Sequence, residues 1–317
     1  MKSFAFVFPG QGSQAPGMLD AWGDHPAVRQ TLSEASDALG EDMGRLIKES
    51  SKETLALTTN TQPVMLVAGV AAYRVWMAET GALPAAAVAG HSLGEYTALV
   101  ASGVLSLSQA APLVRFRAQA MQDAVPVGLG AMAAILGLDA GKVIEGCDEA
   151  MQGFGPGTPE VVEAVNFNEP MQTVIAGTKA AVARACEILK ANGAKRALSL
   201  PVSAPFHSSL MKPAADRLRE RLLGTEFAVP TIPVINNVDV AIESSPDRIR
   251  AALYRQAFGA VRWVECVQAI KLRGLTTLVE CGPGKILAGM VKKIDPQLTG
   301  VPLFDPASLA AVKELLV

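Results

Sequence analysis

Charge and cysteine are scarce in this sequence, and each shortage argues against a class of function. The 317 residues carry a formal net charge of −2 at pH 7, which argues against nucleic acid as the main partner. The four cysteines are Cys147, Cys186, Cys266 and Cys281. They lie far apart, without the spacing of metal ligands, so we expect no metal site. Because unpaired cysteines also fit a reducing compartment, we expect a cytoplasmic protein.

Long apolar runs are missing as well. The longest uncharged stretches, residues 54–73 and 96–114, are broken by proline, glutamine and hydroxyl side chains, so we expect no membrane span. The apolar run FAFVF at residues 4–8 is too short for the core of a signal peptide. A chain of this length can bury the core of one large domain and a smaller one.

An alternation of strand and helix patterns indicates an α/β sheet. The buried-type run at residues 4–8 and a second at 85–89 read as inner parallel strands, and helical spacing appears at 61–79 and 107–124. Further expected elements are the strands 232–236 and 275–280 and the helices 27–39, 208–223, 246–258, 261–272 and 286–294.

The middle of the chain follows a different order. Strands are expected at 131–137, 161–166, 172–176 and 197–200, and helices at 140–151 and 178–192. This β-α-β-β-α-β order is typical of a ferredoxin-like unit. Thr178 is the expected N-cap of the second helix, and Gly193 its stop signal. We therefore predict an α/β-hydrolase-like domain with a parallel sheet, residues 1–127 and 199–317, and an inserted ferredoxin-like subdomain, residues 128–198.

The motif GHSLG at residues 90–94 predicts a nucleophile elbow, because it follows a strand and precedes a helix. Ser92 would then project from a sharp turn. Gly90 and Gly94 would leave room for that turn, while free N–H groups at the helix start would point toward an oxyanion formed at Ser92.

A serine nucleophile needs a base, and the chain holds only three histidines. His91 adjoins Ser92 and should point away from it, and His25 lies in a loop without companion chemistry. His207, in a proline-rich loop, is therefore the expected base. No acid completes a triad. Cys281 is a rival nucleophile at a strand end, although a small buried strand residue is its simpler interpretation.

Two further features leave alternatives open. The loop PGQGSQ at residues 9–14 loosely fits a dinucleotide fingerprint, but proline and glycine follow where a helix should start, and the acid at the right distance, Glu34, lies in a helical segment. We favour a loop in which Gln11 presents its backbone N–H to the cleft of Ser92. Arg115 and Arg117 point about 200° apart on one helix, so only one can face that cleft.

Six segments together resemble the malonyl-CoA:acyl carrier protein transacylases over essentially the full length. They are FPGQGSQ at 8–14, GHSLGE at 90–95, Arg117, NFNEP at 166–170, PVSAPFH at 201–207 and ECGPG at 280–284. The chain departs from the family at three places: Ala118 and Met171 replace usual glycines, and Cys281 replaces a common valine.

The resemblance implies a mechanism. Ser92 would attack the thioester of malonyl-CoA, with His207 taking and returning the proton and the backbone N–H groups of Gln11 and Leu93 holding the oxyanion. The phosphopantetheine thiol of holo acyl carrier protein would then accept the malonyl group in ping-pong fashion. Arg117 would bind the free carboxylate, and the backbone carbonyl of Gln256 would orient His207.

The resemblance also implies substrate and context. Leu93 and Phe206 are residues that malonyl-selective relatives tend to carry. We expect a monomer that supplies fatty-acid synthesis, takes a coenzyme A thioester as substrate and holds no permanent cofactor. Three alternatives remain: a trans-acting acyltransferase of polyketide synthesis, a serine hydrolase, and a carrier-protein-binding module with a degenerate site.

Overall fold

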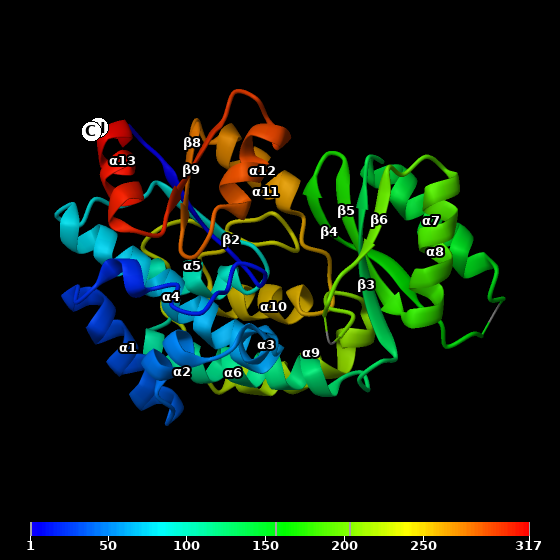
Figure 1. Ribbon diagram of the computed structural model, residues 1–317, viewed down its shortest axis with the longest axis horizontal. Coiled ribbons are helices and arrows are strands. Elements are labelled where there is room, and N and C mark those ends of the chain that lie inside the picture. Colours follow the sequence, from blue (N-terminus) through cyan, green and yellow to red (C-terminus); the bar gives the residue numbers. More distant parts are fainter. Residues whose placement is uncertain (1, 156, 203, 317) are drawn as a thin grey trace.

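A five-stranded parallel sheet forms the larger part of the molecule. The structure, a computed structural model, describes residues 2–155, 157–202 and 204–316. The strands lie in the order β7-β2-β1-β8-β9, and each neighbouring pair is parallel (Figure 1). Their bounds are β1 Ala5–Phe8, β2 Ala87–Gly90, β7 Val234–Ile235, β8 Thr277–Cys281 and β9 Thr299–Leu303. The predicted mixed α/β fold with a parallel sheet is confirmed.

The central strand β1 explains why helices cover both faces of this sheet. Successive side chains of a strand point to opposite faces. Phe4, Phe6 and Phe8 enter one hydrophobic core, and the Phe6 ring meets the indole of Trp76 edge-on at 5.7 Å. Ala5 and Val7 enter a second core on the opposite face. A strand that is apolar at every position is therefore buried on both sides, as in other parallel sheets.

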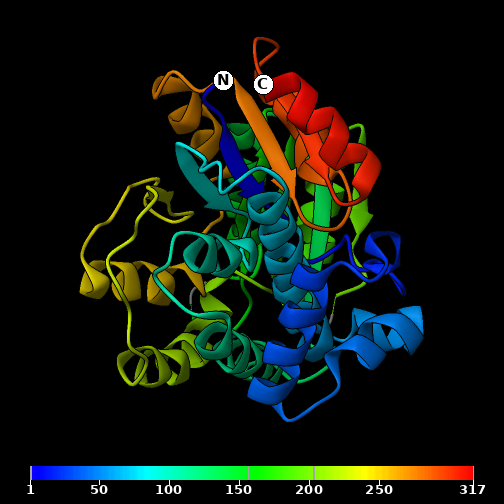
Figure 2. The same cartoon turned by 90° about the vertical axis from the view of Figure 1, so that its left-hand side faces the viewer.

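The helices of the first 125 residues gather beneath the strands in the view of Figure 2. The helices of the larger part are α1 Pro26–Leu39, α2 Met43–Glu49, α3 Lys52–Ala56, α4 Thr58–Glu79, α5 Gly94–Ala101, α6 Leu107–Asp123, α9 Lys212–Leu223, α10 Pro246–Gln256, α11 Trp263–Leu272, α12 Ile286–Ile294 and α13 Pro306–Leu316, with short 3₁₀ turns at Asp20–Trp22 and Ser209–Met211.

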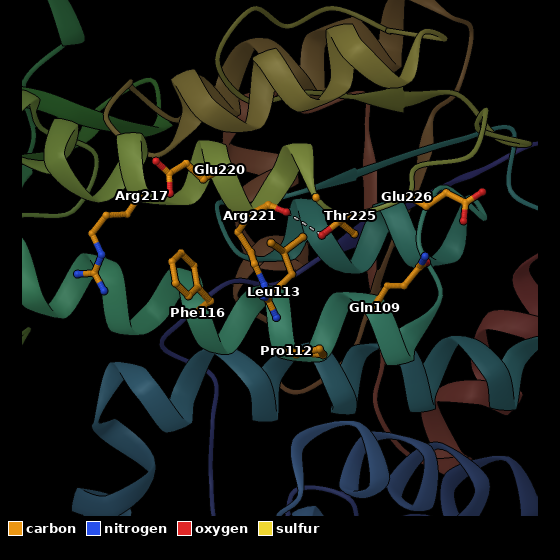
Figure 3. A pocket seen from close by; sticks show the side chains of 10 residues that line it. Gln109, Pro112, Leu113, Phe116, Arg217, Glu220, Arg221, Thr225 and Glu226 are labelled. Carbon is orange, nitrogen blue, oxygen red and sulfur yellow. Dashed lines mark hydrogen bonds between the residues drawn. The ribbon is translucent and has the colours of Figure 1, made fainter.

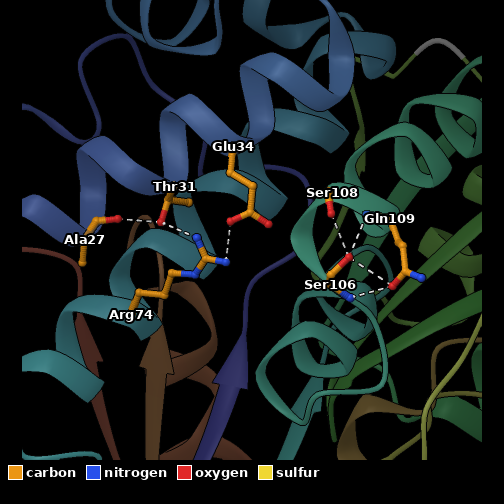
Figure 4. Close-up of polar contacts among 7 residues, drawn as sticks. All are labelled: Ala27, Thr31, Glu34, Arg74, Ser106, Ser108 and Gln109. Atoms are coloured by element: carbon orange, nitrogen blue, oxygen red, sulfur yellow. Dashed lines mark hydrogen bonds and ion pairs between the residues drawn. The ribbon is translucent and has the colours of Figure 1, made fainter.

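Side-chain contacts join α1 to α4 and cap the start of α6 (Figure 4). Arg74 of α4 forms an ion pair with Glu34 of α1, at 2.8 Å. Glu34 therefore joins two helices and is not placed to bind a ribose. This agrees with our rejection of the dinucleotide-binding interpretation. Ser106 and Gln109 form a reciprocal capping box that starts α6, the helix that carries Arg117.

A second sheet has four antiparallel strands in the order β4-β5-β3-β6. Its elements are β3 Gly130–Leu136, α7 Ala140–Gln152, β4 Val162–Glu169, β5 Gln172–Thr178, α8 Lys179–Ala191 and β6 Arg196–Ser199, which is the predicted order. Helices α7 and α8 cover the face turned away from the parallel sheet (Figure 1).

Details of the prediction need correction. Thr178 occupies the N-cap position of α8, but its hydroxyl contacts Glu160 instead of capping the helix. The predicted helix 261–272 starts at Trp263, because Val261 bonds to β4: its N–H donates to the Val165 carbonyl at 2.8 Å. This pairing joins the small sheet to the segment that precedes α11. In the described part of the chain, every helix is too short or too polar to cross a bilayer.

Candidate active site

Ser92 sits at a strained turn between β2 and α5. Its φ of 51° lies in the left-handed region, which a non-glycine residue seldom adopts outside functional sites. The side chain of Asn237 holds this turn: its Oδ1 accepts from the Ser92 N–H at 2.7 Å, and its Nδ2 donates to the Gly90 carbonyl at 2.7 Å. The backbone N–H of Ser92 is therefore already bonded within the protein.

Close backbone contact explains the glycines on either side of Ser92. A Cβ at Gly90 would lie 1.9 Å from the Gly94 carbonyl oxygen, and one at Gly94 would lie 2.1 Å from the Phe8 carbonyl oxygen. Neither neighbour is a flexible side chain, so the turn itself would have to move. The motif is thus enforced by packing of α5 against β1 and β2.

We predict that Gly90→Ala lowers the free energy of unfolding by about 3 kcal/mol through this overpacking. The measurement is the midpoint of urea denaturation, with Gly289→Ala as the matched control. A Cβ at Gly289, inside α12, meets no atom within 4 Å. The control should be stabilised by about 0.5 to 1 kcal/mol, because alanine suits a helix better than glycine. Equal midpoints for both variants would contradict the packing argument.

His207 lies directly against the serine. Its Nε2 is 2.6 Å from Ser92 Oγ, and its Nδ1 is 2.9 Å from the backbone carbonyl of Gln256. Since a carbonyl only accepts, Nδ1 carries the hydrogen and Nε2 is free to accept the serine proton. Burial, followed by the nearby charge of Arg117, lowers the pKa of His207 to about 3. The imidazole is therefore neutral near pH 7.

Arg117 points into the same place. Its Nη1 donates to Gln62 Oε1 at 2.6 Å, and its Nη2 donates to Gln256 Oε1 at 3.0 Å and to Ser92 Oγ at 3.2 Å. Arg115, two residues earlier on α6, instead pairs with Glu41 at the surface. The geometry thus decides which of the two arginines faces the serine.

These groups line a cavity of about 130 Å³ between the two sheets. Its apolar wall includes Met132 of β3 and Phe206, and Gln11 and Leu93 also face it. Gln11 and Leu93 lie outside the helices and strands. Within the described part of the chain, the backbone N–H group of neither residue donates a hydrogen bond. A small apolar cavity with a few convergent polar groups is typical of a ligand site.

Three residues that sequence reasoning missed hold the site together. Gln62 and Asn237 gave no signal, because single amide residues outside a motif are common. Glu95 stands in the quoted GHSLGE segment, but it was given no role. Its Oε2 accepts from the backbone N–H of Asn237 at 2.9 Å and from Gln256 Nε2 at 3.0 Å. Burial raises the pKa of Glu95 to about 7.

The other candidate base, His91, and the other candidate nucleophile, Cys281, do not take part in the contacts at Ser92. The His91 ring bonds to Asn168 Oδ1 at 2.8 Å and packs edge-on against Trp263, so it does not share the serine proton. Cys281 is buried, and that burial raises the pKa of its thiol well above the ordinary value, which makes it a poor nucleophile. Over the described ranges, no three His, Cys, Asp or Glu side chains cluster as metal ligands would.

A larger groove, of about 700 Å³, lies between α6 and α9 (Figure 3). Gln109 and Phe116 of α6 line one side, and Arg217 and Arg221 of α9 the other. It shares no lining residue with the cavity at Ser92. The cavity at Ser92, and not this groove, brings a hydroxyl into contact with an imidazole.

Comparisons with known proteins assign this chain to a family. Residues 5–295 match the acyl transferase domain family. The malonyl CoA-acyl carrier protein transacylase of Escherichia coli K12 is 51% identical over 316 residues, covering 99% of this chain and 100% of the relative. The enzyme of the same name from Haemophilus influenzae is 50% identical, with both chains covered completely.

Solved structures agree with the sequence relatives. The acyl-carrier-protein S-malonyltransferase of Burkholderia pseudomallei superimposes with a TM-score of 0.94 at 61% identity, covering 99% of this chain and 100% of that one. A malonyl-transacylase in complex with its holo type II PKS acyl-carrier protein gives 0.95 at 49% identity, with the same coverage. This chain therefore belongs to the acyl transferase family, among the malonyl-CoA:acyl carrier protein transacylases.

Proposed function

We propose that the protein transfers the malonyl group from malonyl-CoA to the phosphopantetheine thiol of holo acyl carrier protein, through a malonyl ester of Ser92. One observation carries the proposal: Ser92 Oγ lies 2.6 Å from His207 Nε2 and 3.2 Å from Arg117 Nη2. Nucleophile, base and a carboxylate-binding cation thus meet at one atom. The names of relatives at 50% identity or more support the same activity.

The first half of the reaction uses His207 as base. Ser92 Oγ attacks the thioester carbon while its proton passes to His207 Nε2, and a tetrahedral oxyanion forms. The N–H groups of Gln11 and Leu93 hold that oxyanion, because the N–H of Ser92 is already bonded to Asn237. The C–S bond then breaks, and coenzyme A leaves with the proton from His207.

The second half runs the same steps in reverse with a different thiol. The phosphopantetheine thiol gives its proton to His207 and attacks the malonyl ester, and Ser92 leaves with that proton. No carboxylate is needed to orient His207, since the Gln256 carbonyl accepts from Nδ1. This arrangement accounts for the missing third acid of a hydrolase triad.

Arg117 selects the acyl group. Its planar guanidinium is held by Gln62 and Gln256, and such a fork suits a carboxylate better than the point charge of lysine. The small cavity, walled in part by Leu93 and Phe206, fits a short acyl group.

The two sheets support the finer fold assignment. We infer that residues 128–198 form a ferredoxin-like subdomain inserted into an α/β-hydrolase-like domain of residues 1–127 and 199–317. The β-α-β-β-α-β order and the fully antiparallel pairing of the small sheet support it.

The proposed setting is fatty-acid synthesis in the cytoplasm, with the enzyme acting as a monomer without a permanent cofactor and without nucleic acid or membrane as partner. A second setting is favoured by one observation, since the relative at 49% identity was solved with a type II PKS acyl-carrier protein. Transfer rates to the two kinds of carrier protein would separate these settings.

Intact-protein mass spectrometry tests the activity. Incubation with malonyl-CoA should add one malonyl group to the wild type and none to Ser92→Ala, and holo carrier protein, but not its apo form, should remove it. Loss of the malonyl group at equal rates with and without holo carrier protein would indicate a hydrolase. Carrier binding without any adduct would indicate a binding module.

A further inference from the structure

A buried carboxylate and a buried cation face each other across one amide side chain beneath the elbow. Glu95 and Arg117 are each 2% exposed, and Gln256 between them is fully buried. Arg117 Nη2 donates to Gln256 Oε1 at 3.0 Å, and Gln256 Nε2 donates to Glu95 Oε2 at 3.0 Å. The three side chains form one continuous hydrogen-bonded chain.

The direction of these bonds is fixed. A guanidinium only donates, so the oxygen of the Gln256 amide must face Arg117 and its NH₂ group must face Glu95. That NH₂ group also donates to the Ser92 carbonyl at 3.0 Å. Among the described residues, the polar partners of Arg117 are Gln62, Ser92 and Gln256, none of them an acid. Glu95, which Arg117 reaches through Gln256, is thus a buried counter-charge of Arg117.

The other titratable groups around Glu95 do not serve as counter-charges of Arg117. Tyr96 lies beside it on α5, the Cys266 thiol faces it from α11, and Asp239 approaches after β7. Tyr96 and Cys266 are neutral near pH 7, since burial raises the pKa of Tyr96 to about 12 and raises the pKa of the Cys266 thiol well above its ordinary value. Asp239 already pairs with Arg255. Arg117 is the cation that acts on Glu95.

We propose that Glu95 is a positioning residue that balances the charge of Arg117 while the site is empty, and that takes up a proton from solvent when a malonyl carboxylate binds Arg117. This inference rests on the proposed function. A second carboxylate on Arg117 would leave an uncompensated negative charge in a dry site, which is costly. Oε2 already accepts two hydrogen bonds, so the proton goes to Oε1.

The sign of the pH effect follows from this linkage. In the empty site burial raises the pKa of Glu95 to about 7, and a bound anion raises it further. Between these two pKa values the bound state holds more protons than the free state, so preference for the malonyl group falls as pH rises. Well below pH 7, Glu95 is protonated in both states and the effect vanishes. Glutamine at position 95 imitates the protonated form at every pH.

The test is the ratio of kcat/KM for malonyl-CoA between wild type and Glu95→Gln from pH 6 to pH 9. The ratio cancels the titration of His207, which both proteins share. If the bound anion raises the pKa of Glu95 by one unit, the ratio should fall about tenfold across this range. With acetyl-CoA, which brings no second carboxylate, the ratio should not change with pH.

Glu280→Gln is the matched control. Glu280 is also buried, with its pKa raised to about 7, but it accepts from the Ala288 N–H at the start of α12. The ratio of kcat/KM for malonyl-CoA between wild type and Glu280→Gln should be independent of pH. A pH-independent ratio for Glu95→Gln as well would overturn the proposal. The proposed function would survive that result as long as wild type still forms malonyl-Ser92.

Calorimetry covers the case in which Glu95→Gln fails to fold. Ser92→Ala binds malonyl-CoA without turnover, and titration in two buffers of different ionisation enthalpy counts the protons taken up. Glu95 should take up about half a proton more with malonyl-CoA than with acetyl-CoA at pH 7.5, for a one-unit rise in its pKa. Equal proton uptake with both ligands would overturn the proposal.

Discussion

Formation of malonyl-Ser92 should slow by about 10⁴-fold in His207→Ala, because the variant removes the group that accepts the serine proton. The imidazole contacts the serine directly, with Nε2 2.6 Å from Oγ, and the Gln256 carbonyl fixes Nδ1. No other imidazole can replace it, because His91 is bonded to Asn168. Quenched-flow mass spectrometry of the acyl-enzyme measures the rate of this step directly.

The matched control is His25→Ala. His25 caps α1 at the surface and pairs with Glu79, so its loss should leave the rate of acylation unchanged. Because His207 is buried and neutral, its replacement by alanine should also leave a folded protein that binds malonyl-CoA. A rate for His207→Ala within tenfold of wild type would remove His207 from the mechanism.

Arg117→Ala should lower kcat/KM for malonyl-CoA by about a thousandfold, which is the usual loss when one partner of a desolvated charge pair is truncated. The same variant should use acetyl-CoA at least as well as wild type, because an uncharged acyl group makes no ion pair with Arg117 that the substitution could remove. The measurement is the ratio of kcat/KM for the two thioesters. The expected result is a reversal of acyl preference and not a uniform loss.

Arg115→Ala provides the comparison on the same helix. Arg115 pairs with Glu41 at the surface, and such pairs contribute little, so acyl preference should stay as in wild type. Arg117→Lys should behave like the alanine variant toward malonyl-CoA, since one ammonium cannot replace a fork that contacts Gln62, Gln256 and the substrate. Unchanged malonyl preference in Arg117→Ala would exclude the carboxylate clamp.

The site residues that could be predicted from the sequence are those marked by a short local motif or by a rare residue type. Ser92 follows from a strand, two glycines and a helix within a dozen residues. His207 follows by elimination, because the chain has only three histidines. Arg117 could be separated from Arg115 only by the family resemblance, since the helical pattern itself leaves both orientations open.

The missed residues act across long sequence separations. Asn237 lies 145 residues from Ser92, and Gln256 lies 161 residues from Glu95. The sequence near Asn237 does not indicate which backbone groups its side-chain amide will bond to. These partners depend on how β7 and α11 pack against β2. Tertiary packing, and not local pattern, selects these partners.

One strand of the confirmed α/β fold was not predicted, because it lies at a sheet edge that allows unusual residues. Strand β9 contains Gly300 and Pro302, which weaken a strand pattern, yet an edge strand tolerates proline because one side of its backbone stays unpaired. The short helices α2 and α3 and the final helix α13 were also missed. Lengths of five and seven residues for α3 and α2 are too short for periodicity to appear.

Strands β3, β4 and β5 of the small sheet pack against other elements on both faces, and this limits how substrates enter. Ala133 and Ile175 pack under α7 and α8, whereas Met132, Val165 and Val174 belong to the core of the large part. Hinging the sheets apart would expose the second group, at about 2 kcal/mol for each side chain. We therefore expect both substrates to reach the cavity at Ser92 without the two sheets opening. We expect the encounter with carrier protein, and not the opening of the two sheets, to be the rate-limiting step of turnover.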